Sequence, residues 1–306
     1  MLKADEFRRL SDIPPEVEWF ADIQNLNTRE AYRRDLGQFM AFLGINEPGQ
    51  FREVARAHII AWRKSLEKEK LSAASIRRKL AALSSLFTYL CERNAVASNP
   101  TLGVSRPKEG SNEGKTPALS DDQARSLLEA PPADTWQGKR DRAMLAVLLY
   151  HGLRASELCA LTVGDYGERR GIKTLIVHGK GEKIRYLPVH PKAIAALADY
   201  LGASAHAQGG DAGVPLFIPA PAQVGGQVKL MARYNITYLL ERYAPKLGIP
   251  ARPHALRATA ATNALENGAD FGKVQTWLGH ANPMTTKLYD KRKDRPEESP
   301  TFKVEY

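Results

Sequence analysis

The chain has 306 residues, of which 43% are hydrophobic and 25% are charged, and these proportions exclude an intrinsically disordered protein. The length predicts about two domains, each able to bury a core of its own. The net charge of +10 favours a polyanionic partner, which leaves DNA, RNA and an anionic membrane surface open. The two cysteines do not indicate a disulfide framework or a zinc site, and we expect buried reduced thiols at both. The N-terminus shows no apolar signal region, and we expect a cytoplasmic protein without a membrane span.

The first hundred residues contain three stretches with helical spacing of apolar residues and no strand signal. Asn27 and Glu30 resemble a capping pair before the first stretch, and the third begins near Ser72. The third stretch places five apolar residues on one face: Ile76, Leu80, Leu83, Leu86 and Leu90. We therefore predict an N-terminal helical bundle over residues 1–98.

The opposite face of the third predicted helix is basic and carries Arg77, Arg78 and Lys79. Two interpretations stay open for these candidate DNA-binding residues. They contact the DNA backbone, or they form a solvated basic face of the kind that is common on any helix.

The stretch 99–118 is rich in Pro, Gly, Ser and Asn, which predicts a linker between two domains. Ser120 and Gln123 then form a plausible capping box for a new helix.

The second predicted domain, 119–306, mixes helices with a few strands. A helix is expected over 140–150 with Gly152 as its C-cap, and further helices begin at Pro191, Arg233 and Pro253. The β-rich runs 174–177 and 184–189 flank a glycine-containing turn and predict a hairpin. The fold class is therefore mainly α, of the α+β kind, with a small antiparallel sheet in the second domain.

Three segments of this domain carry residues suited to cutting a DNA strand. In the transition state of that reaction the nonbridging oxygens of the phosphodiester gain charge, so catalysis needs cations there and a nucleophile in line. Arginine is the preferred cation because its planar fork binds phosphate oxygens in pairs. Residues 152–158 read GLRASEL, residues 254–257 read HALR, and residues 278–280 read LGH with Tyr289 nine residues later.

These motifs, in this order, resemble the signature of the tyrosine recombinases, the phage integrase family. The Gly-Lys-Gly turn at 179–181 resembles the lysine-bearing hairpin of the same family, and the stretch 274–281 is similar to the segment before its nucleophile. The resemblance covers roughly residues 25–290 and is strongest after Arg140. It implies a SAM-like core-binding domain followed by a catalytic domain of mixed helices and strands.

The resemblance also implies a role for each of six catalytic residues. Arg154 and Arg257 clamp the nonbridging oxygens of the scissile phosphate, and His280 contacts one of them. Lys180 donates a proton to the leaving 5′ oxygen. His254 binds the phosphate and manages the proton of Tyr289, which attacks phosphorus and forms a 3′-phosphotyrosine. No metal, ATP or other cofactor is then required.

Some residues depart from the family pattern or leave its assignment open. Ala258, Asn263 and Gly272 differ from the usual residues, which bears on the geometry of the site and not on the reaction class. Lys173 and Lys183 compete with Lys180 for the role of the hairpin lysine. Without the motifs, Tyr289 would be an ordinary core or surface tyrosine, and Arg154 would simply pair with Glu157 one turn away.

The implied partners are double-stranded DNA and the chain itself, as a tetramer on two paired DNA sites, with no membrane. The alternatives are a type IB topoisomerase, a catalytically silent DNA-binding protein and an RNA-binding module. Residues 301–306 alternate polar and apolar side chains, which predicts a strand that docks on a sheet edge in its own subunit or in a neighbour; a frayed terminus is the alternative.

Overall fold

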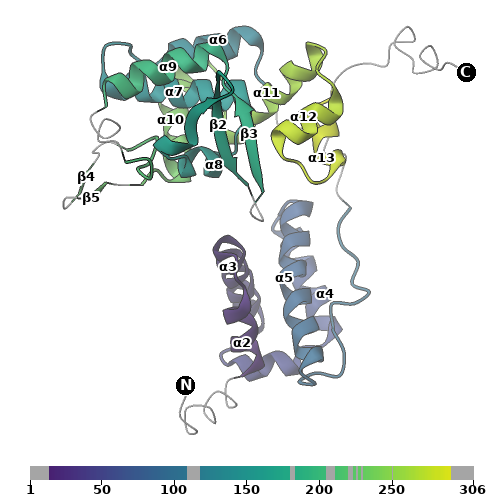
Figure 1. Cartoon of the computed structure of the whole chain (residues 1–306). Helices are drawn as coiled ribbons and strands as arrows, with labels where there is room; N and C mark the ends of the chain where they lie inside the picture. The colour runs from purple at the N-terminus through teal and green to yellow at the C-terminus, as the bar shows by residue number, and fades with distance from the viewer. Residues whose placement is uncertain are drawn as a thin grey trace, which may run out of the picture. The chain divides into compact units, whose positions relative to one another are not determined.

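A computed structural model of the chain describes residues 14–108, 118–179, 183–204, 211–219, 223–224, 227–228, 230–249 and 251–290. The chain divides into two compact units, Met1–Ser111 and Asn112–Tyr306 (Figure 1). The division falls inside the predicted linker 99–118, while the bounds of the two domains stay a prediction.

The first unit is a bundle of helices, as the apolar spacing predicted. Its helices are α2 (Pro15–Asp22), α3 (Leu26–Leu43), α4 (Arg56–Lys68) and α5 (Ala73–Glu92), with the 3-10 helix η1 (Pro48–Glu53) between α3 and α4. The five apolar residues predicted on one face of the third helix are all buried, in a core that also contains Phe39 and Trp62. Residues 14–108 contain no strand.

The predicted cap of α3 was wrong by two residues. Asn25, and not Asn27, is the N-cap, and its side chain accepts a hydrogen bond from the Thr28 backbone N–H at 3.0 Å. The Arg29 N–H closes the first turn onto the Asn25 carbonyl at 2.9 Å, so the helix already includes Asn27. The start of α5 at Ser72 is confirmed, because its hydroxyl caps the helix.

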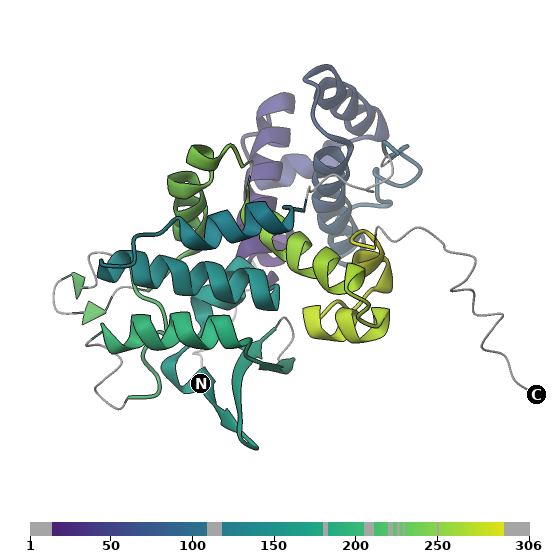
Figure 2. The same ribbon diagram turned by 90° about the horizontal axis from the view of Figure 1, so that it is seen from above.

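The second unit combines helices with a small sheet. Its helices are α6 (Asp121–Glu129), α7 (Trp136–His151), α8 (Ala155–Ala160), α9 (Pro191–Gly202), α10 (Arg233–Tyr243), α11 (Pro253–Glu266), α12 (Phe271–Leu278) and α13 (Pro283–Lys287), with the 3-10 helices η2 (Val163–Asp165) and η4 (Pro245–Leu247). Helix α7 lies between α6 and α9 (Figure 2) and also packs against α11. The predicted helix starts at Pro191, Arg233 and Pro253 are confirmed, as is the capping box of Ser120 and Gln123.

The sheet of this unit is antiparallel, with strand order β1–β2–β3. The predicted hairpin is β2 (Ile172–His178) and β3 (Ile184–Pro188), and β1 (Tyr166–Arg169), which the sequence did not predict, pairs with β2. Leu175 lies opposite Leu187, and both side chains are buried. One face of the sheet therefore packs on the helices while the other stays exposed. A separate ribbon joins β4 (Gln223–Val224) to β5 (Gln227–Val228).

The last three helices, α11 to α13, form a small core of their own at the yellow end of the second unit (Figure 1). This core consists of Ala258, Ala261, Leu265, Val274, Leu278 and Tyr289. This core therefore packs Tyr289 against α11, the helix that carries the predicted catalytic residues His254 and Arg257.

Two predictions concern residues outside the described ranges: the hairpin lysine, Lys180, and the strand at 301–306.

The two cysteines, Cys91 and Cys159, were expected to be buried and are half-buried instead. Burial raises the pKa of the Cys159 thiol to about 11.

Candidate active site

The turn after α7 presents Arg154 at the start of α8. The predicted C-cap of α7, Gly152, has a φ of +59°, in the left-handed region that favours glycine. A Cβ at this position would lie 2.9 Å from Leu278 Cδ2, so the turn runs close to the end of α12. Arg154 is the N-cap residue of α8. The turn thus places Arg154 in the same part of the molecule as α12.

The buried carboxylate of Glu157 holds Arg154 in place. It accepts hydrogen bonds from the Arg154 side-chain NH1 at 2.6 Å and from the Arg154 backbone N–H at 2.9 Å. The same carboxylate lies 2.9 Å from Arg185 NH2 and 3.9 Å from Arg257 NH1. Three guanidiniums share one negative charge, so the cluster keeps a net positive charge, as a phosphate-binding site needs.

Helix α11 supplies His254 and Arg257 from its first turn. Pro253 starts the helix, and the two side chains follow one turn apart. His254 is exposed, whereas Arg257 is only 2% exposed. Arg257 donates to the carbonyls of Gly152 at 2.5 Å and Leu278 at 2.6 Å. The guanidinium therefore joins the ends of α7 and α12 to α11, and it has further N–H donors beyond these bonds.

The turn after α12 presents His280. Gly279 has a φ of +68°, and a Cβ there would lie 2.6 Å from Arg185 NH1, so the backbone favours glycine and any other residue would displace Arg185. His280 is 9% exposed. Its Nε2 lies 2.8 Å from Arg257 NH2, and its Nδ1 lies 2.8 Å from the hydroxyl of Thr286.

Tyr289 follows α13 and points back to α11. Its side chain is 5% exposed, and its hydroxyl lies 3.1 Å from His254 Nε2. Its ring centroid is 6.0 Å from that of His280. The backbone carbonyl of Tyr289 accepts a hydrogen bond from the Thr262 hydroxyl at 3.2 Å, which ties the residue to α11.

Burial and the nearby arginines set the protonation states of this cluster. His254 keeps part of its side chain exposed, but partial burial, together with Arg257 and Arg154, lowers its pKa. Burial and the same two arginines lower the pKa of His280 to about 4. Burial and Arg154 lower the pKa of Arg257 to about 10. Burial also raises the pKa of the Tyr289 hydroxyl, although both arginines act in the opposite direction. At neutral pH the two histidines are therefore neutral, Arg257 is charged and the tyrosine is protonated.

The structure brings five of the six predicted catalytic residues together in one cluster: Arg154, His254, Arg257, His280 and Tyr289. The sixth, Lys180, is not among the described residues. Of the two competing lysines, Lys183 is exposed beside the hairpin turn, and Lys173 lies opposite Glu168, at the far end of the hairpin.

Arg185 is a residue of this cluster that the motifs did not reveal. It lies on β3, contacts Glu157, and donates to the Trp277 carbonyl at 2.9 Å. The sequence did contain a signal for it. Side chains alternate between the two faces of a strand, so Arg185 shares the inward face of β3 with the buried Leu187. An arginine on the buried face of a strand needs a charged or polar partner, here supplied by Glu157 and the end of α12.

The candidate DNA-binding residues of α5 have different environments within the first unit. Lys79 is 5% exposed and donates to Asp35 Oδ1 at 3.1 Å, so its charge is paired in the interior. Arg78 is exposed and pairs with the same aspartate. Arg77 is partly exposed. The helix therefore offers Arg77 and Arg78 to solvent, but not Lys79.

The departures from the family pattern lie in ordinary structural positions. Ala258 is buried in the core of the last three helices, where a small side chain fits. Asn263 donates to Asp121 Oδ1 at 2.8 Å and so links α11 to α6. Gly272 is in the first turn of α12, which forms despite it.

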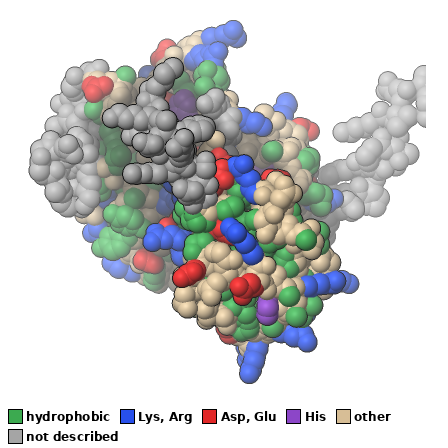
Figure 3. All heavy atoms as spheres, turned by 90° about the horizontal axis from the view of Figure 1, so that it is seen from below, with side chains coloured by type: hydrophobic (Ala, Val, Ile, Leu, Met, Phe, Trp, Pro, Cys, Tyr) green, Lys and Arg blue, Asp and Glu red, His purple; other side chains and the backbone are tan. Residues whose placement is uncertain are grey.

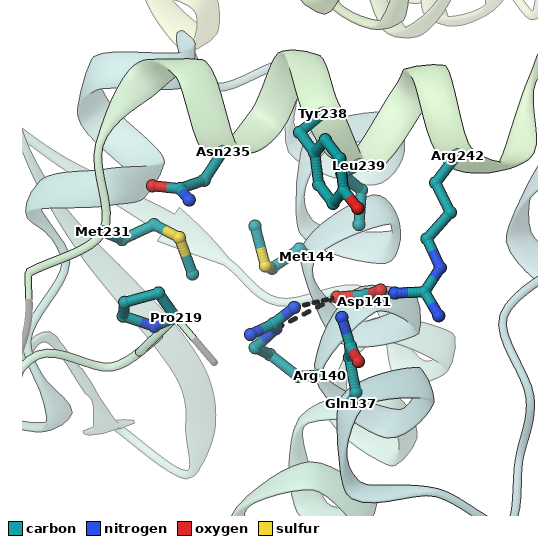
Figure 4. A pocket seen from close by; sticks show the side chains of 10 residues that line it. All are labelled: Gln137, Arg140, Asp141, Met144, Pro219, Met231, Asn235, Tyr238, Leu239 and Arg242. Carbon is teal, nitrogen blue, oxygen red and sulfur yellow. Dashed lines mark hydrogen bonds and ion pairs between the residues drawn. The ribbon is translucent and has the colours of Figure 1, made fainter. Parts of the chain in front are cut away.

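A pocket of about 90 Å³ lies apart from this cluster, between α7, α10 and the segment near Pro219 (Figure 4). Its charged pair, Arg140 and Asp141, points inward and is joined at 2.7 Å. Arg140 also donates to the Ile218 carbonyl, and Asp141 accepts from the Tyr243 hydroxyl at 2.9 Å. These bonds tie α7 to α10, so we assign the pair a structural role.

Lys and Arg side chains occur in several separate groups on the face drawn in Figure 3, with Asp and Glu between them. Within the described ranges, no group of three His, Cys, Asp or Glu side chains is arranged to hold a metal ion. None of the helices formed by the described residues is both long and apolar enough to cross a membrane.

Sequence models of two protein families match the chain. The Phage integrase family matches residues 117–295, and the Phage integrase, N-terminal SAM-like domain matches residues 23–94. The chain is 35% identical to tyrosine recombinase XerC of Herpetosiphon aurantiacus over 265 residues, covering 86% of this chain and 84% of the relative. It is 38% identical to tyrosine recombinase XerD of Pseudomonas aeruginosa over 270 residues, covering 86% of each.

Solved structures share the fold. The Tn1549 transposon integrase in complex with circular intermediate DNA matches with a TM-score of 0.69 and 18% identity, covering 95% of this chain and 99% of that chain. A lambda integrase dimer bound to a COC′ core site matches with a TM-score of 0.68 and 16% identity, covering 98% of this chain and all of that one (100%). These likenesses confirm the predicted fold class.

Proposed function

The chain belongs to the phage integrase family, whose members are tyrosine recombinases, and from that premise we propose that it cuts and rejoins DNA with Tyr289 as its nucleophile. Site-specific recombination of DNA is the activity that follows from family membership, and double-stranded DNA is the partner. The observation that carries the residue assignment is the 3.1 Å contact between the Tyr289 hydroxyl and His254 Nε2, beside two arginines.

Cleavage begins when the Tyr289 oxygen attacks the scissile phosphorus. The Tyr289 proton passes to His254 Nε2, which is neutral at pH 7 and so able to accept it. A bond forms between the tyrosine oxygen and phosphorus, and the bond from phosphorus to the 5′ oxygen breaks. Lys180 donates the proton that the leaving 5′ oxygen takes up. The product is a 3′-phosphotyrosine and a free 5′ hydroxyl.

Arg154 and Arg257 bind the nonbridging oxygens of the phosphate as charge builds up on them. Both guanidiniums are held before DNA arrives, Arg154 by Glu157 and Arg257 by two carbonyls. A preorganised cation stabilises the transition state without a cost of reorganisation during the reaction. The covalent link conserves the energy of the broken bond, so the 5′ hydroxyl of a partner strand reseals the DNA without ATP.

A tetramer on two paired sites is the assembly in which exchange between partner strands takes place. Each site has two half-sites and binds two protomers, so joining two sites brings four protomers together. Mass photometry of the chain on its DNA site should show complexes of two protomers on one site and four on two sites. A complex that never exceeds one site would exclude this assembly.

The alternatives from the sequence are not favoured by the family match. A type IB topoisomerase uses similar chemistry but relaxes any supercoiled DNA, whereas a recombinase requires two partner sites. A silent DNA-binding protein would have no need of Tyr289, and an RNA-binding module would need an aromatic platform that the sequence lacks. Incubating the chain with a supercoiled plasmid that carries one site, or two, separates relaxation from exchange.

The nucleophile is tested by covalent trapping. Selection from a randomised duplex pool for binding to the protein supplies a DNA site, called the selected site below. In a selected site with a nick beside the cleavage position, cleavage releases a short fragment that carries the free 5′ hydroxyl. This fragment diffuses away and cannot reseal the DNA, so the wild-type chain stays linked to the 3′ phosphate. Tyr289→Phe keeps the ring and should bind the same DNA while forming no adduct. An adduct that persists in this variant would refute the assignment.

A further inference from the structure

We propose that Thr286 is a positioning residue of the active site, which holds the ring of His280 in the one orientation and tautomer that fit the Arg257 guanidinium. The proposal rests on the proposed function, in which Arg257 binds the scissile phosphate. Thr286 is three residues before Tyr289, on α13, and its side chain is completely buried.

The hydrogen bonds around His280 allow only one tautomer. A guanidinium has N–H donors and no acceptor, so Arg257 NH2 donates to His280 Nε2 across their 2.8 Å contact. Nε2 must then be free of a proton, and a neutral imidazole carries its proton on Nδ1. The Nδ1–H faces the Thr286 hydroxyl oxygen at 2.8 Å and donates to it. The opposite tautomer would direct an Nε2–H at the donors of Arg257.

Thr286 also fixes the backbone of the nucleophile. Its carbonyl accepts the Tyr289 N–H at 3.0 Å, while its hydroxyl binds His280. The rings of His280 and Tyr289 are stacked at an interplanar angle of 29°. One buried threonine therefore joins the phosphate clamp to the residue that attacks the phosphate.

Loss of this hydroxyl leaves the Nδ1–H of His280 buried without its acceptor. The imidazole ring can avoid this unsatisfied donor by changing tautomer or by rotating. Either change removes the acceptor nitrogen that faces Arg257. The buried Thr286 side chain points to His280 and not to solvent, so its loss should slow cleavage and leave the affinity for DNA unchanged.

The test compares three variants with the wild-type chain on the nicked selected site. Thr286→Val removes the hydroxyl and keeps the shape, Thr286→Ser keeps the hydroxyl, and Thr285→Val makes the same change one residue away at a partly exposed position. We expect the single-turnover rate of adduct formation to fall about 10- to 100-fold in Thr286→Val, at unchanged Kd. Thr286→Ser should recover most of the rate, and Thr285→Val should equal the wild type.

A second measurement reads the tautomer directly. In ¹⁵N-histidine-labelled protein without DNA, long-range ¹H–¹⁵N correlation distinguishes a protonated from an unprotonated ring nitrogen, and loss of one set of signals in His280→Gln assigns the residue. We expect the proton on Nδ1 in the wild type and in Thr286→Ser, and a shift toward Nε2 in Thr286→Val.

Two results would overturn the proposal: an Nε2 proton on His280 in the wild-type chain, or a wild-type cleavage rate in Thr286→Val. If Thr286→Val does not fold, the wild-type spectrum and the cleavage rate of Thr286→Ser still test the proposal. A wild-type chain that forms no adduct with DNA would instead refute the proposed function. The tautomer measurement is made without DNA, so its result would not depend on that outcome.

Discussion

At the level of single residues, the charges of the site converge on Glu157. Its carboxylate lies 2.6 Å from Arg154, 2.9 Å from Arg185 and 3.9 Å from Arg257, and it is itself buried. Arg257 is buried and Arg185 is partly buried, and these two cations cannot stay close to each other and to the exposed Arg154 without this counter-charge. Glu157 is therefore as important to the shape of the site as the arginines that it holds.

Glu157→Gln should lower the free energy of unfolding by about 3 kcal/mol, because it leaves buried guanidiniums without their counter-charge. Glu168→Gln is the matched control, since Glu168 pairs with Lys173 at 3.5 Å on the exposed side of the sheet. That exposed pair should contribute about 0.5 kcal/mol or less. Urea denaturation of both variants gives the two numbers. Equal losses would show that burial of the carboxylate does not matter.

Two histidines should make the fold sensitive to acid. Burial lowers the pKa of His151 and of His280 from 6.5 to about 4. Above pH 6.5 each is neutral in both the folded and the unfolded chain. As the pH falls from 6.5 to 4, the unfolded chain takes up protons that the folded chain excludes, so the free energy of unfolding decreases.

The expected slope is about 1.4 kcal/mol per pH unit for each histidine in that window. Urea denaturation measured between pH 6.5 and pH 4 gives the slope, and His151→Gln should remove the part of the slope that His151 contributes. A slope that is the same with and without His151 would contradict the assignment.

At the level of elements, the glycines that end helices decide how closely the segments of the site approach one another. Gly279 ends α12 with a φ of +68°, directly against Arg185. Gly248 ends η4 with nearly the same φ of +67°, but a Cβ there would meet nothing within 4 Å. The two positions share the left-handed backbone conformation and differ in the packing around them.

Gly279→Ala and Gly248→Ala should therefore share a loss of stability of about 1 kcal/mol, the cost of a left-handed residue with a Cβ. Only Gly279→Ala should also slow adduct formation, because Arg185 and the turn that carries His280 must move apart. Thermal unfolding and single-turnover cleavage of both variants separate the two effects. An equal cleavage rate in the two variants would show that the contact with Arg185 is not needed.

The helices also show which features could be predicted from the sequence. Helix starts marked by a proline or a capping box, such as Pro253 and Ser120, were predicted correctly because the signal is local. Asn27 carries a capping pattern with Glu30 and Asn25 does not, yet the closed first turn makes Asn25 the N-cap. The motifs indicated Arg154 and Arg257 as candidates because their neighbours in the sequence are distinctive, and the structure places both in one cluster.

Other features depend on contacts between distant segments, which no local pattern records. Arg185 enters the site because β3 packs beside α12, and Lys79 leaves solvent because Asp35 on another helix pairs with it. The tautomer that we propose for His280 likewise rests on Arg257, which is 23 residues away in the sequence.

At the level of the whole molecule, two units with separate hydrophobic cores are joined by one segment. Each unit has a core of its own and should fold alone. The net charge of +10 is spread over both, which motivates the proposal that both contact the same DNA duplex. A tether then converts the second contact into an intramolecular event at an effective concentration in the millimolar range.

Cutting the tether should therefore weaken binding to the selected site by about 100-fold or more. A protease site inserted between residues 109 and 117 makes the cut without removing either unit. The uncut protein with the same insertion is the control, and residues 119–306 expressed alone should bind as weakly as the cut protein. The measurement is an equilibrium titration of labelled DNA at constant salt, because phosphate contacts make affinity depend strongly on salt. If residues 119–306 alone bind with the affinity of the intact chain, the first unit makes no energetic contribution and the shared-duplex proposal fails.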